Sequence, residues 1–158
     1  SLFLFERPSM RNAITMAITA SLLCACSGPI GPIAGGKLDG IESRWPQDWT
    51  FTDSEDNIFL ETNPNESYSV TLWGVSLDND FFIAAVDPTS NWAKNLAEDN
   101  NVVISVTGKL YRGRAYPISE IGLINRIGQR YQEKYDMARE QGKTFMDDGG
   151  TLYRLSPR

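Results

Sequence analysis

The stretch "KLYRGR" concentrates three cations, Lys109, Arg112 and Arg114, within six residues. Successive side chains of a strand point to opposite faces, so Arg112 and Arg114 share one face and Lys109 lies on the other, unless a bulge at a neighbouring glycine intervenes. Two guanidinium groups on one face can clamp a phosphate or a carboxylate through paired hydrogen bonds. The alternative is a solvated strand face on which these cations pair with acidic neighbours.

The absence of histidine from the 158 residues limits the chemistry of the chain. It excludes Ser–His and Cys–His nucleophiles, and the two cysteines, Cys24 and Cys26, are too few ligands for a zinc site. A formal net charge of −5 argues against non-specific nucleic-acid binding. We therefore expect no metal and no nucleic-acid partner, and no residue is assigned as catalytic. Any redox reaction would depend on a bound cofactor.

The sequence predicts that the elements around the three cations form a mainly antiparallel β domain. Alternation and β-forming residues predict strands at 58–62, 68–77 and 81–87, and the turn at 78–80 has residues that tolerate left-handed backbone. A long strand from Val102 to about Tyr116 follows, in which Gly108 and Gly113 indicate a bulge or bend. The last residues, "TLYRLSPR", predict a short closing strand.

Two helices are expected beside these strands. The stretch "PTSNWAKNLAEDN" predicts a short amphipathic helix that Thr89 or Ser90 caps. One longer helix begins after Ser119 and ends near Gly142. This helix carries a basic stripe, which consists of Arg126, Arg130 and Lys134. The stripe either lies on anionic lipid or pairs with interleaved acidic residues. This order of elements is typical of a curled sheet with peripheral helices.

Four stretches resemble the split-barrel flavin-binding superfamily, which includes pyridoxamine 5'-phosphate oxidases and deazaflavin-dependent reductases. They are "YSVTLWGVSLDNDFFIAAVDPTSNWAKNLAEDNNVVISV", "TGKLYRGRAYPIS", the long helix and "TLYRLSPR". The resemblance implies a mainly β (α+β) fold, a six-stranded antiparallel split β-barrel with peripheral helices. It also implies a homodimer with FMN or a deazaflavin in a groove at the subunit interface.

The resemblance further implies that the cofactor's phosphate is held at the start of the short helix. Ser90 is retained there, whereas Asn91 and Trp92 occupy positions that often hold Arg and Lys. A phosphate favours helix-start amides, hydroxyls and at least one cation. Lys94 lies one turn further on, and the strand offers three alternative cations, Lys109, Arg112 and Arg114.

The resemblance also implies that the flavin ring lies beside the first strand of the hairpin. The strand positions that contact the flavin in the superfamily correspond here to Tyr68, Val70 and Trp73. Trp73 and Trp92 each have two interpretations. Either residue can stack on a flavin or border its pocket, or it can be a core aromatic that buries a large apolar area without any ligand. Ser90 also has two interpretations: it contacts the phosphate of the cofactor, or it is a helix cap that needs no ligand.

An uncharged apolar run, Ala13 to Ala25, follows Arg11 near the start of the sequence. A basic residue before a short apolar run that ends in small residues is typical of an export signal. "LCAC" at its end resembles a bacterial lipobox, with Leu23 and Ala25 before Cys26, which implies cleavage before Cys26 and acylation of that cysteine. The alternative is a buried helix whose two cysteines are redox or metal ligands.

These interpretations divide the chain into upstream residues with a lipoprotein signal peptide (1–25), a flexible tether (26–48) and a split-barrel domain (49–158). We expect a lipid-anchored protein of the bacterial cell envelope, facing the periplasm. It would bind FMN or a deazaflavin and act as an oxidoreductase on a small molecule. The alternative is a cofactor-free barrel that serves as an envelope binding or structural module.

Overall fold

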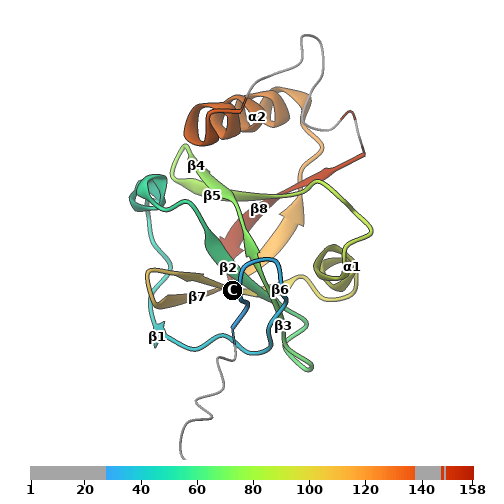
Figure 1. Cartoon of the computed structure of the whole chain (residues 1–158). Helices are drawn as coiled ribbons and strands as arrows, with labels where there is room; N and C mark the ends of the chain where they lie inside the picture. Colours follow the sequence, from blue (N-terminus) through green and yellow to red (C-terminus); the bar gives the residue numbers. More distant parts are fainter. Residues whose placement is uncertain (1–27, 138–146, 148) are drawn as a thin grey trace, which may run out of the picture.

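The computed structural model of this chain describes residues 28–137, 147 and 149–158 (Figure 1). The predicted signal segment, Cys26 and the predicted helix end near Gly142 lie outside these residues. The elements follow in the order β1 (Ile41–Glu42), the 3-10 helix η1 (Thr50–Ser54), β2 (Ile58–Thr62), β3 (Tyr68–Leu72), β4 (Gly74–Leu77), β5 (Asp80–Ala85), α1 (Asn91–Glu98), β6 (Asn101–Val106), β7 (Lys109–Pro117), α2 (Ile121–Tyr135) and β8 (Thr151–Pro157).

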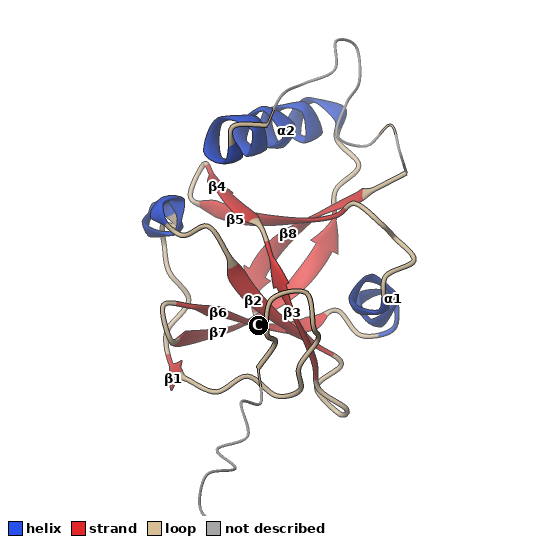
Figure 2. Ribbon diagram, viewed as in Figure 1, coloured by secondary structure: helices blue, strands red, loops and turns tan. Residues whose placement is uncertain are grey.

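One curled sheet forms the body of the domain (Figure 2). Its strands are paired in the order β3-β2-β6-β7-β8-β5-β4, and β1 adds to β7 in parallel outside this path. β3 and β4 stand at the two ends of the path, yet a single residue, Trp73, separates them in sequence. The sheet must therefore curl until its two ends approach each other. This arrangement, with helices outside the sheet, is the split-barrel α+β fold that the sequence predicts.

The strand count differs from the prediction, because the described residues form eight strands rather than six. The expected strand 68–77 is interrupted at Trp73, and the expected long strand from Val102 is a hairpin of β6 and β7. Thr107 and Gly108 connect these two strands with φ values of 50° and 76°. Positive φ at both central residues is the geometry of a tight hairpin turn that suits the twist of the strands. Gly108 thus provides a turn rather than a bulge.

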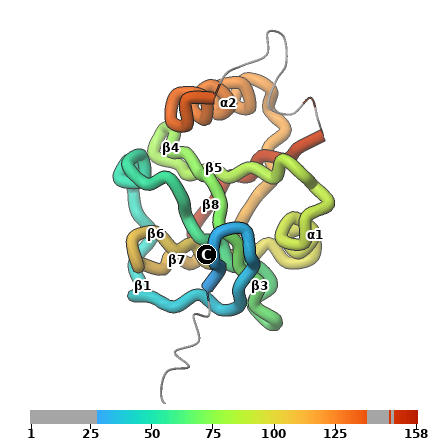
Figure 3. The backbone as a smooth tube through the Cα atoms, in the orientation of Figure 1, coloured from blue at the N-terminus to red at the C-terminus, as the bar shows by residue number. Residues whose placement is uncertain are grey.

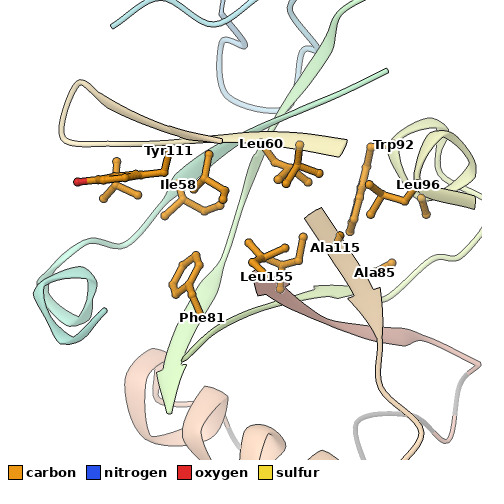
Figure 4. Close-up of a cluster of buried hydrophobic side chains, with 14 of the residues drawn as sticks. Ile58, Leu60, Phe81, Ala85, Trp92, Leu96, Tyr111, Ala115 and Leu155 are labelled. Atoms are coloured by element: carbon orange, nitrogen blue, oxygen red, sulfur yellow. The ribbon is translucent and has the colours of Figure 1, made fainter. Parts of the chain in front are cut away.

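The core lies inside the curled sheet and beneath α1. Alternate residues of the strands point inward, and Trp92 and Leu96 of α1 close one side. Figure 4 shows these side chains converging from several strands, among them Ile58, Leu60, Phe81, Ala85, Tyr111, Ala115 and Leu155. Burial of such large apolar side chains is the main stabilising contribution to the domain.

Residues 28–48, which we call the N-terminal segment, lie against the outside of the barrel (Figure 3). Gly35 exchanges two backbone hydrogen bonds with Ser69, and Leu38 donates its N–H to the buried carboxylate of Glu61 at 2.7 Å. Leu38 is only 5% exposed. Within the predicted tether (26–48), the described residues are thus paired with strands of the barrel. Gly and Pro disfavour a helix, but they do not prevent backbone pairing with existing strands.

α2 covers the outer face of β4, β5 and β8. Ile124, Ile127 and Tyr131 pack there in a second apolar cluster with Val75, Phe82 and Leu152. The helix begins after Glu120 rather than Ser119, and no side chain caps it. Within the described residues, no helix combines the length and the apolar character that crossing a membrane requires.

Candidate functional site

The break between β3 and β4 leaves backbone groups without strand partners, and α2 supplies partners for them. The Tyr131 hydroxyl donates to the carbonyl of Trp73 at 3.2 Å, and the Tyr135 hydroxyl lies 3.1 Å from both the N–H and the carbonyl of Gly74. Lys134 Nζ donates to the carbonyls of Gly74 and Thr52, each at 2.8 Å. Buried backbone groups need such partners, so α2 stabilises the break.

Gly74 is required at the break because Phe81 packs onto its backbone. An added Cβ at this position would lie 2.4 Å from Phe81 Cζ. The ring of Phe81 is itself fixed, because it stacks on Trp49 in the core with ring centroids 4.8 Å apart. The break is thus set by the absence of a side chain at Gly74 and by the rigid ring behind it.

A cavity of about 280 Å³ opens at the strand break. Its walls come from β3, β5, α2 and the residue before β2, and are mostly apolar: Asn57, Thr71, Leu72, Trp73, Ala84, Val86 and Tyr131. Trp73 is 49% exposed, and its ring stacks on Tyr135 with centroids 4.4 Å apart and planes 9° apart. One face of the indole is therefore backed by Tyr135 while the residue still borders the cavity. This is the geometry of a rigid platform for a planar ring.

The described residues that line this cavity are uncharged at neutral pH. Burial raises the pKa of Tyr131 and of Tyr135, so both phenols stay neutral at ordinary pH. Burial also lowers the pKa of Lys134, although the nearby Asp53 opposes that shift. None of the described residues that line the cavity is Lys, Arg, Asp or Glu. The cavity thus suits an apolar or weakly polar ring rather than a charged group.

Val86 lines the cavity, and a short connection leads from it to the start of α1. Ser90 is the N-cap residue, but its hydroxyl makes no capping bond and is buried without a hydrogen-bond partner. The cap interpretation of Ser90 therefore fails to account for its hydroxyl. The first N–H groups of any α-helix also lack partners within the helix. Together they provide donors of the kind that an anion needs.

The turn before α1 is preorganised by Asp87. Its carboxylate accepts hydrogen bonds from the Thr89 N–H at 2.8 Å and from the Thr89 hydroxyl at 2.6 Å. These bonds lower the pKa of the exposed Asp87 carboxyl. The turn therefore holds the connection between Val86 and Ser90 in one conformation.

Among the predicted ring contacts, Trp73 alone lines the cavity. Tyr68 and Val70 are half-buried and pack against the barrel core. Trp92 is 7% exposed and belongs to that core, which supports the core interpretation of this residue. Asn91 and Lys94 are exposed on α1. The sequence did not predict the other residues that line the cavity, because only the folded sheet brings their elements together. They are Asn57, Thr71, Leu72, Ala84, Val86 and Tyr131.

Two of the three strand cations, Arg112 and Arg114, have polar side-chain partners. Arg112 forms a two-point ion pair with Glu42, in which Nε lies 3.1 Å from one carboxylate oxygen. Hydrogen bonding to Glu42 raises the pKa of the Arg112 guanidinium. Lys109 is opposite Ile41 in the register of β1 and β7, and Arg114 contacts Asn101 at 3.4 Å. Arg112 is therefore paired with Glu42 of the N-terminal segment, the arrangement of the alternative interpretation in which the strand cations pair with acidic neighbours.

The basic stripe of α2 also has protein partners. Arg126 pairs with Asp78 at 2.6 Å, and Arg130 pairs with Asp53 at 2.8 Å. Lys134 makes the two carbonyl contacts described above. The stripe thus joins α2 to η1 and to the β4–β5 hairpin, and these acidic partners lie outside the helix. Of the interleaved acidic residues, Glu133 lies 3.7 Å from Arg130. No group of three or more acidic or cysteine side chains among the described residues is arranged to hold a metal.

Solved structures share this fold. A conserved hypothetical protein from Mycobacterium tuberculosis aligns with a TM-score of 0.56 and 17% identity over 73% of this chain and 86% of its own. An F420-H2 dependent reductase aligns at 0.52 and 13% over 65% and 95%. A Listeria innocua protein, named provisionally as a pyridoxamine 5'-phosphate oxidase, aligns at 0.53 and 8% over 69% and 89%. At such identities the likeness establishes the split-barrel fold.

Sequence comparison adds no closer relative. No protein family profile matches the chain, and no curated protein matches it either. The class of the protein therefore follows from its fold: it is a split-barrel protein with an aromatic-walled cavity at the β3–β4 break.

Proposed function

We propose that this protein binds a flavin-type cofactor, FMN or a deazaflavin, in the cavity at the β3–β4 break, and that it is an oxidoreductase acting on a small molecule. The observation that carries the proposal is Trp73, a residue that lines a mostly apolar cavity and whose exposed indole is backed on one face by Tyr135. A bound flavin would supply hydride or electron transfer, for which the chain needs no histidine or metal.

The residues of the cavity fit the ring end of such a cofactor. Trp73 offers a stacking surface, and Leu72, Ala84 and Val86 offer apolar contacts that exclude water. The Asn57 side chain, with its amide donor and acceptor, lines the same cavity and can orient polar ring edges. Tyr131 stays neutral and uses its hydroxyl on the backbone carbonyls of Trp73 and Phe82, so it acts as a wall.

The start of α1 fits the phosphate end of the cofactor. The unpartnered Ser90 hydroxyl and the first N–H groups of the helix would donate to the phosphate oxygens, and the exposed Lys94 would add a positive charge. Val86 lines the cavity and Ser90 follows four residues later, so one short connection joins both ends of the site.

The names of the structural neighbours support the cofactor class. One neighbour is called an F420-H2 dependent reductase, and another bears the provisional name of a pyridoxamine 5'-phosphate oxidase. We extend this class to the present chain as a proposal, together with the homodimer that its superfamily resemblance implies. Acylation at Cys26, and with it a position on the cell envelope facing the periplasm, is likewise part of the proposal.

One observation favours a second candidate, a cofactor-free barrel that acts as an envelope binding module. Arg112 is occupied by Glu42, and Trp92 stands in the core where a cation is frequent in the superfamily. A phosphate would therefore depend on the exposed Lys94 for charge. Under this reading the cavity would take an uncharged apolar ligand.

The absorption spectrum of protein purified from a host that makes both flavins and deazaflavins tests the first candidate. We expect a flavin or deazaflavin band, and a higher melting temperature when FMN or a deazaflavin is added. Ligand at 100 times its dissociation constant adds about 2.7 kcal/mol to the apparent stability. A colourless protein whose melting temperature no flavin raises would leave the cofactor-free candidate standing.

A further inference from the structure

The N-terminal segment carries an exposed apolar turn at residues 30–33. Ile30 is 63% exposed and Ile33 is 68% exposed, and the two residues between them are Gly31 and Pro32. The turn therefore has no polar side chain at all. Exposed turns usually consist of polar residues, Gly and Pro, so two large aliphatic side chains at such a tip point to an interaction.

The two ends of this turn are paired with each other. Ile30 and Ile33 exchange both of their N–H to carbonyl hydrogen bonds at 3.0 Å. Gly35 then fixes the base of the turn to β3 through two hydrogen bonds with Ser69, at 2.9 and 2.8 Å. Backbone groups that are already paired enter an apolar phase at low cost, because none of them loses a hydrogen bond to water.

The turn itself carries no charge. Residues 28–38 contain no acidic side chain, and their one charged residue is the exposed Lys37. The chain as a whole has a net charge of −5. With the exposed Asp39 two residues after Lys37, residues 28–39 carry one basic and one acidic side chain, so a bilayer would meet little net charge at the turn.

The position of Cys26 indicates which partner covers the turn. Cys26 precedes Gly28, the first described residue, by two positions, and two peptide steps span at most about 7 Å. We infer that Ile30 and Ile33 insert into the lipid surface beside an acylated Cys26 and seat the barrel directly on the membrane; this inference rests on the acylation proposed above. The barrel would then have no flexible tether and would hold one orientation on the bilayer.

Tryptophan substitution with brominated lipid tests this seating. The full-length, processed protein is reconstituted into vesicles of phosphatidylcholine and phosphatidylglycerol, with or without brominated acyl chains, as wild type and as Ile30→Trp, Ile33→Trp and Ile121→Trp. Ile121 is 72% exposed at the start of α2, the helix that lies at the top of Figure 1, away from the blue residues 28–36, and it serves as the control. Melting temperatures verify that each variant is folded.

We expect brominated lipid to quench at least half of the added fluorescence of Ile30→Trp and Ile33→Trp, and none of that added by Ile121→Trp. Equal quenching at all three positions in acylated protein would overturn the inference. So would protection of the turn from aqueous iodide without quenching by bromine, because that result would identify a protein as the occupant. Intact mass without acyl chains would instead refute the proposed anchor, on which the seating depends, and would leave flavin binding untouched.

Discussion

The indole of Trp73 and the phenol of Tyr135 stack with their centroids 4.4 Å apart, although 62 positions separate them in the sequence. The Tyr135 hydroxyl also reaches the N–H and the carbonyl of Gly74, so this side chain both backs the platform and stabilises the strand break. These two roles of Tyr135 are separable by substitution.

We expect Tyr135→Phe to keep the stack and Tyr135→Leu to lose it. Loss of the hydroxyl should cost about 1 kcal/mol of unfolding free energy in both variants, because one hydrogen-bonding group is removed. Flavin affinity should fall only in Tyr135→Leu, whose side chain leaves Trp73 without a backing ring. Chemical denaturation and FMN titration measure the two effects. Equal FMN affinities in the two variants would contradict the role of Tyr135 as a support for Trp73.

Substitution of Gly74 by Ala should destabilise the protein. The new Cβ would clash with the Phe81 ring at 2.4 Å, and overpacking of this kind typically costs about 1–3 kcal/mol. Gly122→Ala is the matched control, because its nearest neighbour is the Glu120 side chain at 3.6 Å. Ala is also the better helix former, so the control should gain up to about 1 kcal/mol. Urea midpoints that moved in the same direction for both variants would argue against the clash.

The N-terminal segment should contribute measurably to stability. Leu38 is buried with Val103 and Leu110, and Leu38→Ala should cost at least about 2 kcal/mol. Ile41→Ala removes a side chain that is 72% exposed and should change the free energy of unfolding by less than about 0.5 kcal/mol. Thermal or urea unfolding measures both. If Leu38→Ala were as neutral as the control, the segment would behave as the tether that its composition suggests.

The protein should lose stability above about pH 10. Burial raises the pKa of Tyr131 above its usual value of 10.0, so at higher pH the unfolded chain releases this proton before the folded protein does. The folded state then binds more protons, and the free energy of unfolding falls as pH rises. Lys134 has the opposite effect below its usual pKa of 10.5, because burial lowers its pKa in the folded state. Stability should therefore rise slightly toward pH 10 and then decline.

Tyr131→Phe provides the control for this pH dependence. It should be less stable at neutral pH, because it loses the bonds to the Trp73 and Phe82 carbonyls. Its decline between pH 10 and 11.5 should nevertheless be shallower than that of the wild type, since the raised pKa is absent. Urea unfolding at several pH values measures both slopes, and identical slopes would assign the decline to other groups.

Local patterns predict most of the fold. Runs of β-forming residues predicted β2 and β5, and the left-handed tolerance of Asp78 and Asn79 predicted the turn that connects β4 and β5, where both φ values are positive. The break at Trp73 was not predictable, because residues 68–77 read as continuous β-formers. Its cause is tertiary: the Phe81 ring needs a glycine, and α2 side chains supply the hydrogen bonds that the strand gives up.

The candidate site was less predictable than the fold. Trp73 and Ser90 were predicted from the superfamily resemblance. In the structure Trp73 lines the cavity and the Ser90 hydroxyl is buried without a hydrogen-bond partner. The ion pair of Arg112 was not predictable, because its partner is Glu42. Glu42 belongs to a segment whose Gly and Pro residues predict no structure of their own. Such a segment is ordered by the backbone bonds that neighbouring strands offer. No local pattern in the sequence encodes those bonds.

Titration of FMN and of a deazaflavin against the wild type, Trp73→Leu and Phe59→Leu tests the central claim most directly, with cofactor fluorescence as the signal. Phe59 is an aromatic residue of β2 that is 38% exposed and does not line the cavity, so it is the control. We expect saturable quenching in the wild type and in Phe59→Leu, and about tenfold weaker binding in Trp73→Leu, because ring stacking together with apolar burial is worth on the order of 1.4 kcal/mol. Absence of saturable binding in the wild type, or unchanged affinity in Trp73→Leu, would contradict the proposed cofactor site.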